Sequence, residues 1–123
     1  MPGNQKWNEN VPVLVAIAAA TVTPKGESAK TAAYDTGAAA MALVLQVHAL
    51  GLATPQMGGF DRDVFRAAFS IHDDIQLIAM LAIGYFDDAS QLDEALHERE
   101  AAPRARKPLG ETSFEGAWNK AFE

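Results

Sequence analysis

Two short segments of this 123-residue sequence carry residues whose types and spacing could bind a ligand. In residues 54–61, Gly58 and Gly59 leave the backbone without side chains, so that its N–H groups could approach a flat or anionic ligand closely. Near the C-terminus, Arg104 and Arg106 would point the same way from an extended chain, as a phosphate clamp requires. Both segments also have a plainer interpretation, because a Gly-Gly pair often forms only a turn and a basic tail can serve solubility.

The other polar residues give no sign of catalysis by side chains. The three histidines fall on three different expected elements, and none has a neighbour at a metal-ligand spacing. Two carboxylate pairs flank an expected strand, Asp73 with Asp74 and Asp87 with Asp88. Paired acids can perform acid–base chemistry, but these positions suit loops and helix caps. We therefore expect no catalytic side chain and no metal site.

The pattern of apolar residues predicts the elements that position the two candidate segments. Two continuous runs rich in Val and Ile, residues 11–20 and 75–85, predict strands that are buried on both faces. Residues 31–50 contain no proline and are apolar all round, which predicts a central helix buried on most sides. Gly51 is well placed to end this helix, and Asp61 is expected to cap a short helix that follows.

The C-terminal third changes character. Ser90 is expected to open a polar helix that ends near residue 99, and residues 101–123 are expected to form an extended tail. The order of elements predicts a single α+β domain of three-layer α/β type over residues 1–123, with a central buried helix and a small mixed sheet. An all-helical adaptor is the alternative, which the β-branched, turn-bounded runs disfavour.

Composition and charge exclude several classes of protein. The absence of cysteine excludes a disulfide scaffold, a thiolate zinc site and a cysteine nucleophile. The net charge of −6 argues against a nucleic-acid partner. The apolar run at residues 37–50 is shorter than the roughly 20 residues that cross a bilayer, and the first residues lack a signal-peptide pattern. We therefore expect a cytoplasmic protein without a membrane partner, in which an excess of alanine favours reliance on a second subunit.

A series of motifs, in this order and spacing, resembles the nitroreductase family. They are the runs at residues 4–7, 11–15, 34–37, 49–52, 57–61, 83–85 and 103–109. The resemblance implies a nitroreductase-like fold and a flavin mononucleotide (FMN) protein that uses NAD(P)H to reduce nitroaromatic or quinone-type substrates. It also implies an intertwined homodimer, with the helix over residues 31–50 at its core.

The resemblance further implies which residues bind FMN. They are Gln56, Met57, Gly58, Gly59, Arg104 and Arg106. The first four match the turn that lies along the isoalloxazine ring, where the N–H groups of the two glycines face the N5 and O4 region. The two arginines match the cations that hold the FMN phosphate. Donors near the ring would stabilise negative charge on the reduced flavin.

The sequence departs from the family's pattern at its start. Family members begin with a longer N-terminal portion that carries an Arg-x-Ser-x-Arg motif for the phosphate and an Asn-containing segment for the ring. The sequence matches the C-terminal half of the family or somewhat more, so we expect an N-terminally truncated member. The alternative function is a non-enzymatic remnant or dimerisation module that needs the missing portion to bind FMN.

Overall fold

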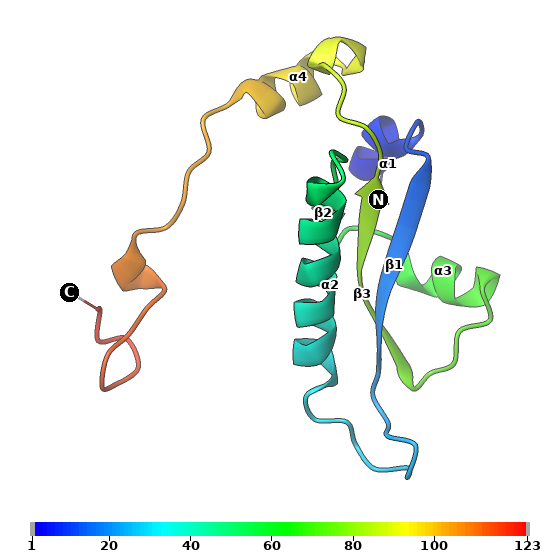
Figure 1. Cartoon of the computed structure of the whole chain (residues 1–123), viewed down its shortest axis with the longest axis vertical. Coiled ribbons are helices and arrows are strands. Elements are labelled where there is room, and N and C mark those ends of the chain that lie inside the picture. Colours follow the sequence, from blue (N-terminus) through cyan, green and yellow to red (C-terminus); the bar gives the residue numbers. More distant parts are fainter. Residues whose placement is uncertain (1, 123) are drawn as a thin grey trace. The chain divides into compact units, whose positions relative to one another are not determined.

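The structure, a computed structural model, describes residues 2–122 (Figure 1). The chain forms two compact units, Met1–Asp87 and Asp88–Glu123, and each is described by itself. The expected single domain over residues 1–123, with a tail from residue 101, stays a prediction.

A three-stranded sheet forms the centre of the first unit. Its strands are β1 (Val13–Ala20), β2 (Gln56–Met57) and β3 (Ile75–Ile83), in the order β1-β3-β2. Both β1 and β2 pair antiparallel with β3. The α+β class is therefore confirmed, but the expectation of a mixed sheet is wrong in this respect. A mixed sheet needs at least one parallel pair of strands. The strands β1 and β2 run in the same direction, but β3 lies between them, so they do not pair with each other.

A bulge interrupts the pairing of β1 with β3. Ile17 lies opposite Ala79 and Ala18 lies opposite Leu77, so that Ile78 is the extra residue of β3. A bulge of this kind disrupts the regular alternation of backbone groups along a strand. At this bulge the carbonyl groups of Leu77 and Ile78 both accept hydrogen bonds from the side chain of Arg62.

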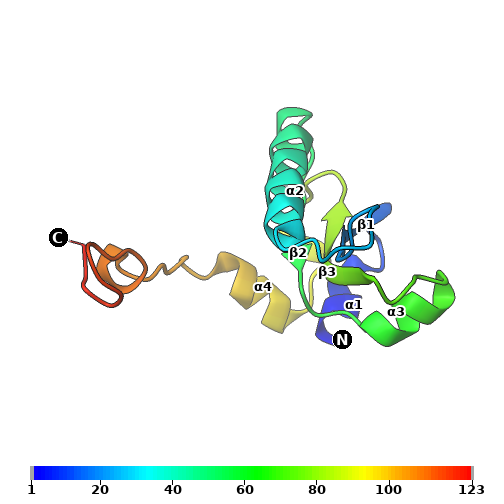
Figure 2. The same cartoon turned by 90° about the horizontal axis from the view of Figure 1, so that it is seen from below.

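Helices lie on both sides of the sheet. Figure 2 shows α2 (Ala32–Ala49) on one side, with α1 (Pro2–Asn8) and α3 (Arg62–Ala68) on the other. The buried core includes Leu81 of the central strand, which is fully inaccessible. The three layers agree with the expected architecture. The helix α1 was not predicted as an element, because residues 2–8 are mostly polar and have no apolar periodicity.

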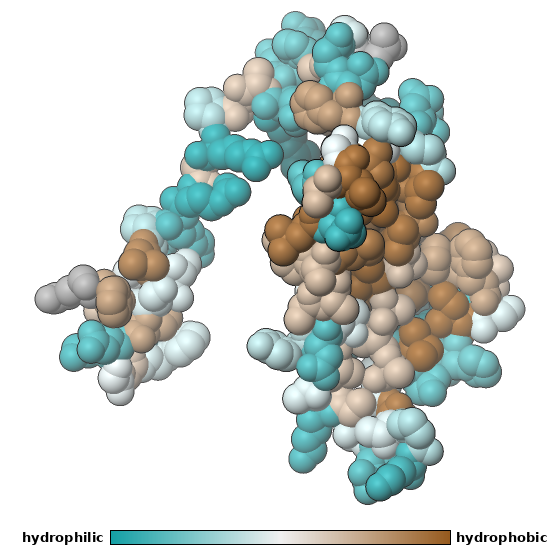
Figure 3. All heavy atoms as spheres, viewed as in Figure 1, coloured by the Kyte–Doolittle hydropathy of each residue, from teal (hydrophilic) through white to brown (hydrophobic). Residues whose placement is uncertain are grey.

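The helix α2 is less buried than the sequence predicted. Its buried residues are Ala40, Val44 and Val47, which share one face. Its opposite side leaves Tyr34 and Leu45 exposed to 79% and 61%. Figure 3 shows apolar residues gathered over the C-terminal half of α2 and the neighbouring strands. The prediction of burial on most sides is wrong for the single chain, because one small sheet covers only one face of a helix.

The strands are also less enclosed than expected. In β1, Val13 and Leu14 are exposed to 48% and 45%. The strand lies at the edge of the sheet and has a pairing partner on one side only. A run of Val and Ile predicts burial on both faces only where other elements cover both faces. That part of the prediction is wrong, although both strands form within the expected residues.

The short helix α3 begins as the sequence predicted. The Asp61 carboxylate accepts a hydrogen bond from the Val64 N–H over 3.0 Å, which satisfies one free donor of the first turn. This hydrogen bond fixes Asp61, the last residue before the helix. This capping interaction places the first helical residue, Arg62, three residues after Gly59, the second residue of the Gly-Gly turn (Gly58 and Gly59).

The second unit contains short helices joined by irregular backbone. They are the 3₁₀-helix Ala89–Gln91, α4 (Glu94–Ala101) and the 3₁₀-helix Leu109–Glu111. The prediction that Ser90 opens the polar helix is wrong, because Asp93 caps α4 by accepting from the Leu96 N–H over 2.9 Å. Ser90 instead donates its backbone N–H to Asp88 in the preceding 3₁₀ turn. Among the residues that the structure describes, no helix has the length and apolar character needed to span a bilayer.

Candidate functional site

The Gly-Gly turn follows directly after the edge strand β2. An isolated bridge between Ala53 and Gly84 precedes this strand, with N–H···O distances of 2.8 and 3.2 Å. Hydrogen-bonded positions alternate along an antiparallel ladder. The N–H group of Gly58 therefore faces away from β3, toward the free edge of the sheet.

The backbone N–H groups of Gly58 and Gly59 are available to a ligand. Neither Gly58 nor Gly59 donates its N–H to another group within residues 2–122. A Cβ atom added to Gly58 would meet nothing within 4 Å, so open space adjoins the turn on that side. A flat ring could therefore lie close to this backbone, which fits the flavin that the sequence analysis predicts.

The side chains of the predicted ring-binding segment point in different directions. Gln56 is exposed, whereas Met57 is 6% exposed and belongs to the core. The Asn8 side-chain amide lies 3.7 Å from the Met57 sulfur. The side chain of Met57 thus anchors the strand, and its neighbours supply the accessible surface.

Two side chains hold the carbonyl groups of the turn. Asn4 of α1 donates its side-chain N–H to the Gly59 carbonyl oxygen over 2.8 Å. Arg62 donates from Nη2 to the Gly58 carbonyl oxygen over 3.2 Å. Since the C=O and N–H groups of a trans peptide point in opposite directions, these bonds also fix the directions of the N–H groups that follow each carbonyl.

Arg62 connects the turn to the bulge in the central strand. Its Nε donates to the Leu77 carbonyl oxygen and its Nη2 to the Ile78 carbonyl oxygen, both over 3.0 Å. The guanidinium also lies over the Phe60 ring, 4.7 Å from its centroid. Sequence reasoning missed this residue, because the bulge that presents both carbonyls has no local sequence signal.

The two predicted phosphate ligands lie in the second unit. Arg104 and Arg106 are exposed, in a segment without helix or strand between α4 and the last 3₁₀-helix. Arg106 donates from Nη1 to the carbonyl oxygen of Ala105 over 3.0 Å. Joint binding of a ligand by the arginines and the turn stays a prediction.

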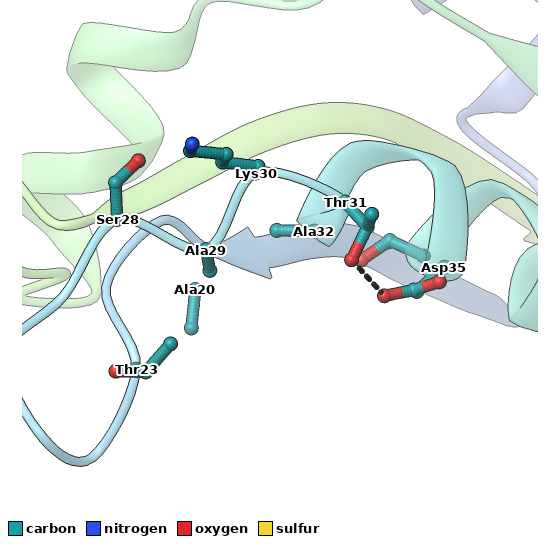
Figure 4. A pocket seen from close by; sticks show the side chains of 9 residues that line it. Ala20, Thr23, Ser28, Ala29, Lys30, Thr31, Ala32 and Asp35 are labelled. Carbon is teal, nitrogen blue, oxygen red and sulfur yellow. Dashed lines mark hydrogen bonds between the residues drawn. The ribbon is translucent and has the colours of Figure 1, made fainter.

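A pocket of about 550 Å³ lies at the start of α2 (Figure 4). Hydroxyl groups, Lys30 and Asp35 contribute to its lining. The Thr31 hydroxyl donates to the Asp35 carboxylate over 2.9 Å, so these two groups satisfy each other. The pocket contains none of the predicted site residues and is broadly open.

Comparison with known proteins identifies the family and the fold. The family model for nitroreductases matches residues 1–85, which include the sheet, α2 and the Gly-Gly turn. The architecture thus defines a nitroreductase-fold protein. The chain belongs to the nitroreductase family, which confirms the resemblance seen in the sequence.

Solved structures support the same assignment. A crystal structure of an oxidoreductase containing FMN is 35% identical, with a TM-score of 0.87 over 98% of this chain and 62% of that one. A nitroreductase family protein from Clostridium difficile 630 is 24% identical, with a TM-score of 0.63 over 89% of this chain and 62% of that one. The second likeness concerns the fold alone.

A curated relative from Mycolicibacterium smegmatis is described as an uncharacterized 15.4 kDa protein in the ask 5′ region. It is 37% identical over 97 residues, which are 76% of this chain and 65% of the relative. The chain therefore spans less than two thirds of the length of these first relatives.

Proposed function

We propose that this chain carries the flavin-facing part of an FMN-dependent oxidoreductase. The observation that supports this most directly is the Gly-Gly turn, with N–H donors that no described residue uses and open space beside Gly58. Family membership and the likeness to an oxidoreductase containing FMN point the same way.

In this proposal, Gln56, Met57, Gly58 and Gly59 lie along the isoalloxazine ring. The two glycine N–H groups donate toward the N5 and O4 region, and the bonds from Asn4 and Arg62 hold the turn in place. Bound FMN supplies hydride transfer between NAD(P)H and a nitroaromatic or quinone-type substrate. The protein contributes position and hydrogen bonds, and no side chain acts as a nucleophile.

The phosphate of FMN is proposed to bind Arg104 and Arg106. Both guanidinium groups are exposed, and the only bond described for either is the local one from Arg106 to its neighbour. A guanidinium fork matches a phosphate group well, because it can donate two parallel hydrogen bonds. The arginines would in this way hold the phosphate end of the cofactor.

The proposed assembly is a cytoplasmic homodimer. The apolar side of α2 that includes Tyr34, Met41 and Leu45 is exposed in the single chain. Exposed apolar surface of this kind favours association. In the proposed dimer, this side of α2 packs against the partner subunit.

Titration with FMN tests the proposal. The purified chain is expected to bind FMN, to become yellow and to oxidise NADH or NADPH when a quinone or nitroaromatic compound is added. A well-folded chain that takes up no FMN would contradict the proposal and favour the alternative of a dimerisation module. Binding without turnover would support the cofactor site and reject enzymatic activity of this chain alone.

A further inference from the structure

We infer that Arg62 is a positioning residue that sets the direction of the Gly59 N–H and thereby tunes the flavin. This inference rests on the proposed function. It starts from the contacts of the guanidinium, which donates to the carbonyl groups of Gly58, Leu77 and Ile78. One of these belongs to the turn and the other two belong to the bulge of β3.

The location of Arg62 explains why such a residue is needed. The pairing of β2 with β3 ends at Met57 opposite Met80, so the ladder gives no support to Gly58. Glycine has the greatest backbone freedom, and two successive glycines would move readily without external bonds. Arg62 replaces the missing ladder by connecting Gly58 to β3 through its side chain.

The consequence for the donor follows from peptide geometry. The Gly58 carbonyl and the Gly59 N–H belong to one planar peptide and point in opposite directions. When the guanidinium binds the carbonyl, the N–H is held pointing away from Arg62. A cation at the carbonyl also polarises the peptide, which makes its N–H a stronger donor.

A stronger and better directed donor favours negative charge on a ligand at that position. Reduction by a hydride places a hydrogen on N5, whereas O4 gains electron density from the reduced ring, so an N–H group directed at O4 binds the reduced flavin more strongly than the oxidised flavin. Arg62 is therefore expected to stabilise bound reduced FMN more than bound oxidised FMN. Its loss is expected to lower the reduction potential, whereas a purely structural residue would weaken both forms alike.

The chain offers a matched control in Arg66, one turn further along α3. Arg66 also donates to three backbone carbonyl groups, those of Ile71, His72 and Ile75. None of these belongs to the Gly-Gly turn. Arg66→Gln therefore removes the same kind of side chain and a similar set of bonds without releasing Gly58.

The experiment compares Arg62→Gln, Arg62→Lys and Arg66→Gln in the full chain. For Arg62→Gln, affinity for reduced FMN is expected to fall about tenfold more than affinity for oxidised FMN. That difference lowers a two-electron potential by about 30 mV. Arg62→Lys is expected to restore part of the shift, because it keeps the charge but not the fork. Equal potentials in Arg62→Gln and Arg66→Gln would overturn the inference.

A second measurement does not need flavin. In the ¹⁵N-labelled apo chain, Arg62→Gln is expected to move the Gly59 amide resonance and to speed its hydrogen exchange, whereas Arg66→Gln leaves both unchanged. If the unaltered chain binds no FMN, the proposed function fails and this measurement still tests the positioning role. An unchanged Gly59 amide in Arg62→Gln would overturn that role.

Discussion

The side-chain amide of Asn4 donates to the carbonyl oxygen of Gly59 over 2.8 Å, across 55 residues of the sequence. This bond connects α1 to the Gly-Gly turn and holds the peptide between Gly59 and Phe60. It complements the bond from Arg62 to Gly58. Each glycine carbonyl is therefore held by a side chain from a different helix, and the turn is fixed before any ligand binds.

Asn4→Ala is expected to loosen the turn. Loss of one partly buried hydrogen bond should lower the free energy of unfolding by about 1 kcal/mol, measured by urea denaturation. The affinity for FMN should fall as well, because the turn then has to become ordered upon binding. Asn8→Ala is the matched control, since Asn8 lies on the same helix and the hydrogen bond described for its side chain is a 3.7 Å contact with the Met57 sulfur. Equal effects of both variants on FMN affinity would contradict the role of Asn4.

Local sequence signals predicted much of the fold. The long helix forms within one residue of the predicted bounds at either end, and Asp61 caps α3 as expected. Continuous Val and Ile runs located both long strands. These features depend on caps, turns and apolar patterns that act over a few residues.

The contacts that hold the candidate site depend on tertiary structure. The bulge at Ile78 arises from strand pairing, and the three-carbonyl contact of Arg62 needs that bulge. The start of α4 was missed because Ser90 and Asp93 are both good capping residues, and only the folded chain shows which of them begins the helix. The exposed side of α2 could not be predicted from a pattern that is apolar all round.

Gly58→Val is expected to block flavin binding while leaving the fold intact. A Cβ atom at this position meets no protein atom within 4 Å, and Gly58 has no positive φ that would strain a larger residue. Thermal unfolding should therefore stay close to that of the unaltered chain. In the proposed site the branched side chain occupies the space of the ring, so FMN fluorescence quenching should be lost.

Gly58→Ala serves as the size control for that variant. Its single methyl group should weaken FMN binding less than the valine side chain does, with the same thermal stability. Normal FMN occupancy in Gly58→Val would contradict the placement of the ring beside Gly58.

The double variant Arg104→Ala with Arg106→Ala is expected to weaken FMN binding. Each charge-assisted hydrogen bond to the phosphate contributes about 1.5–3 kcal/mol, so isothermal titration should detect the loss readily. Riboflavin provides the control, because it lacks the phosphate and should bind both chains equally. A matched loss for riboflavin would show that the arginines do not act through the phosphate.

Asp88 should respond to pH in a defined direction. Hydrogen bonds from the side chain and the backbone N–H of Ser90 hold the pKa of the Asp88 carboxyl below its ordinary value of 3.8. Because the pKa of Asp88 is lower in the folded chain than in the unfolded chain, the ionised carboxylate stabilises the folded chain at pH values above the unfolded pKa. This stabilisation is lost as the pH falls through the folded pKa. Ser90→Ala removes the larger contribution, so the Asp88 titration followed by NMR should move upward. A midpoint at or above 3.8 in the unaltered chain would refute this.

The exposed side of α2 provides a test of the proposed homodimer. Leu45 is 61% exposed in the single chain, and a glutamate there should cost little in folding. In a dimer that buries this side of α2, Leu45→Glu would place a charge without a partner in an apolar interface, which is strongly unfavourable. Light scattering should therefore give the mass of one chain for this variant and of two for the unaltered protein.

Val64→Glu is the control, because Val64 is 65% exposed but lies on α3, outside the proposed interface. A dimer that persists in Leu45→Glu, or that is lost equally in Val64→Glu, would reject this side of α2 as the contact surface.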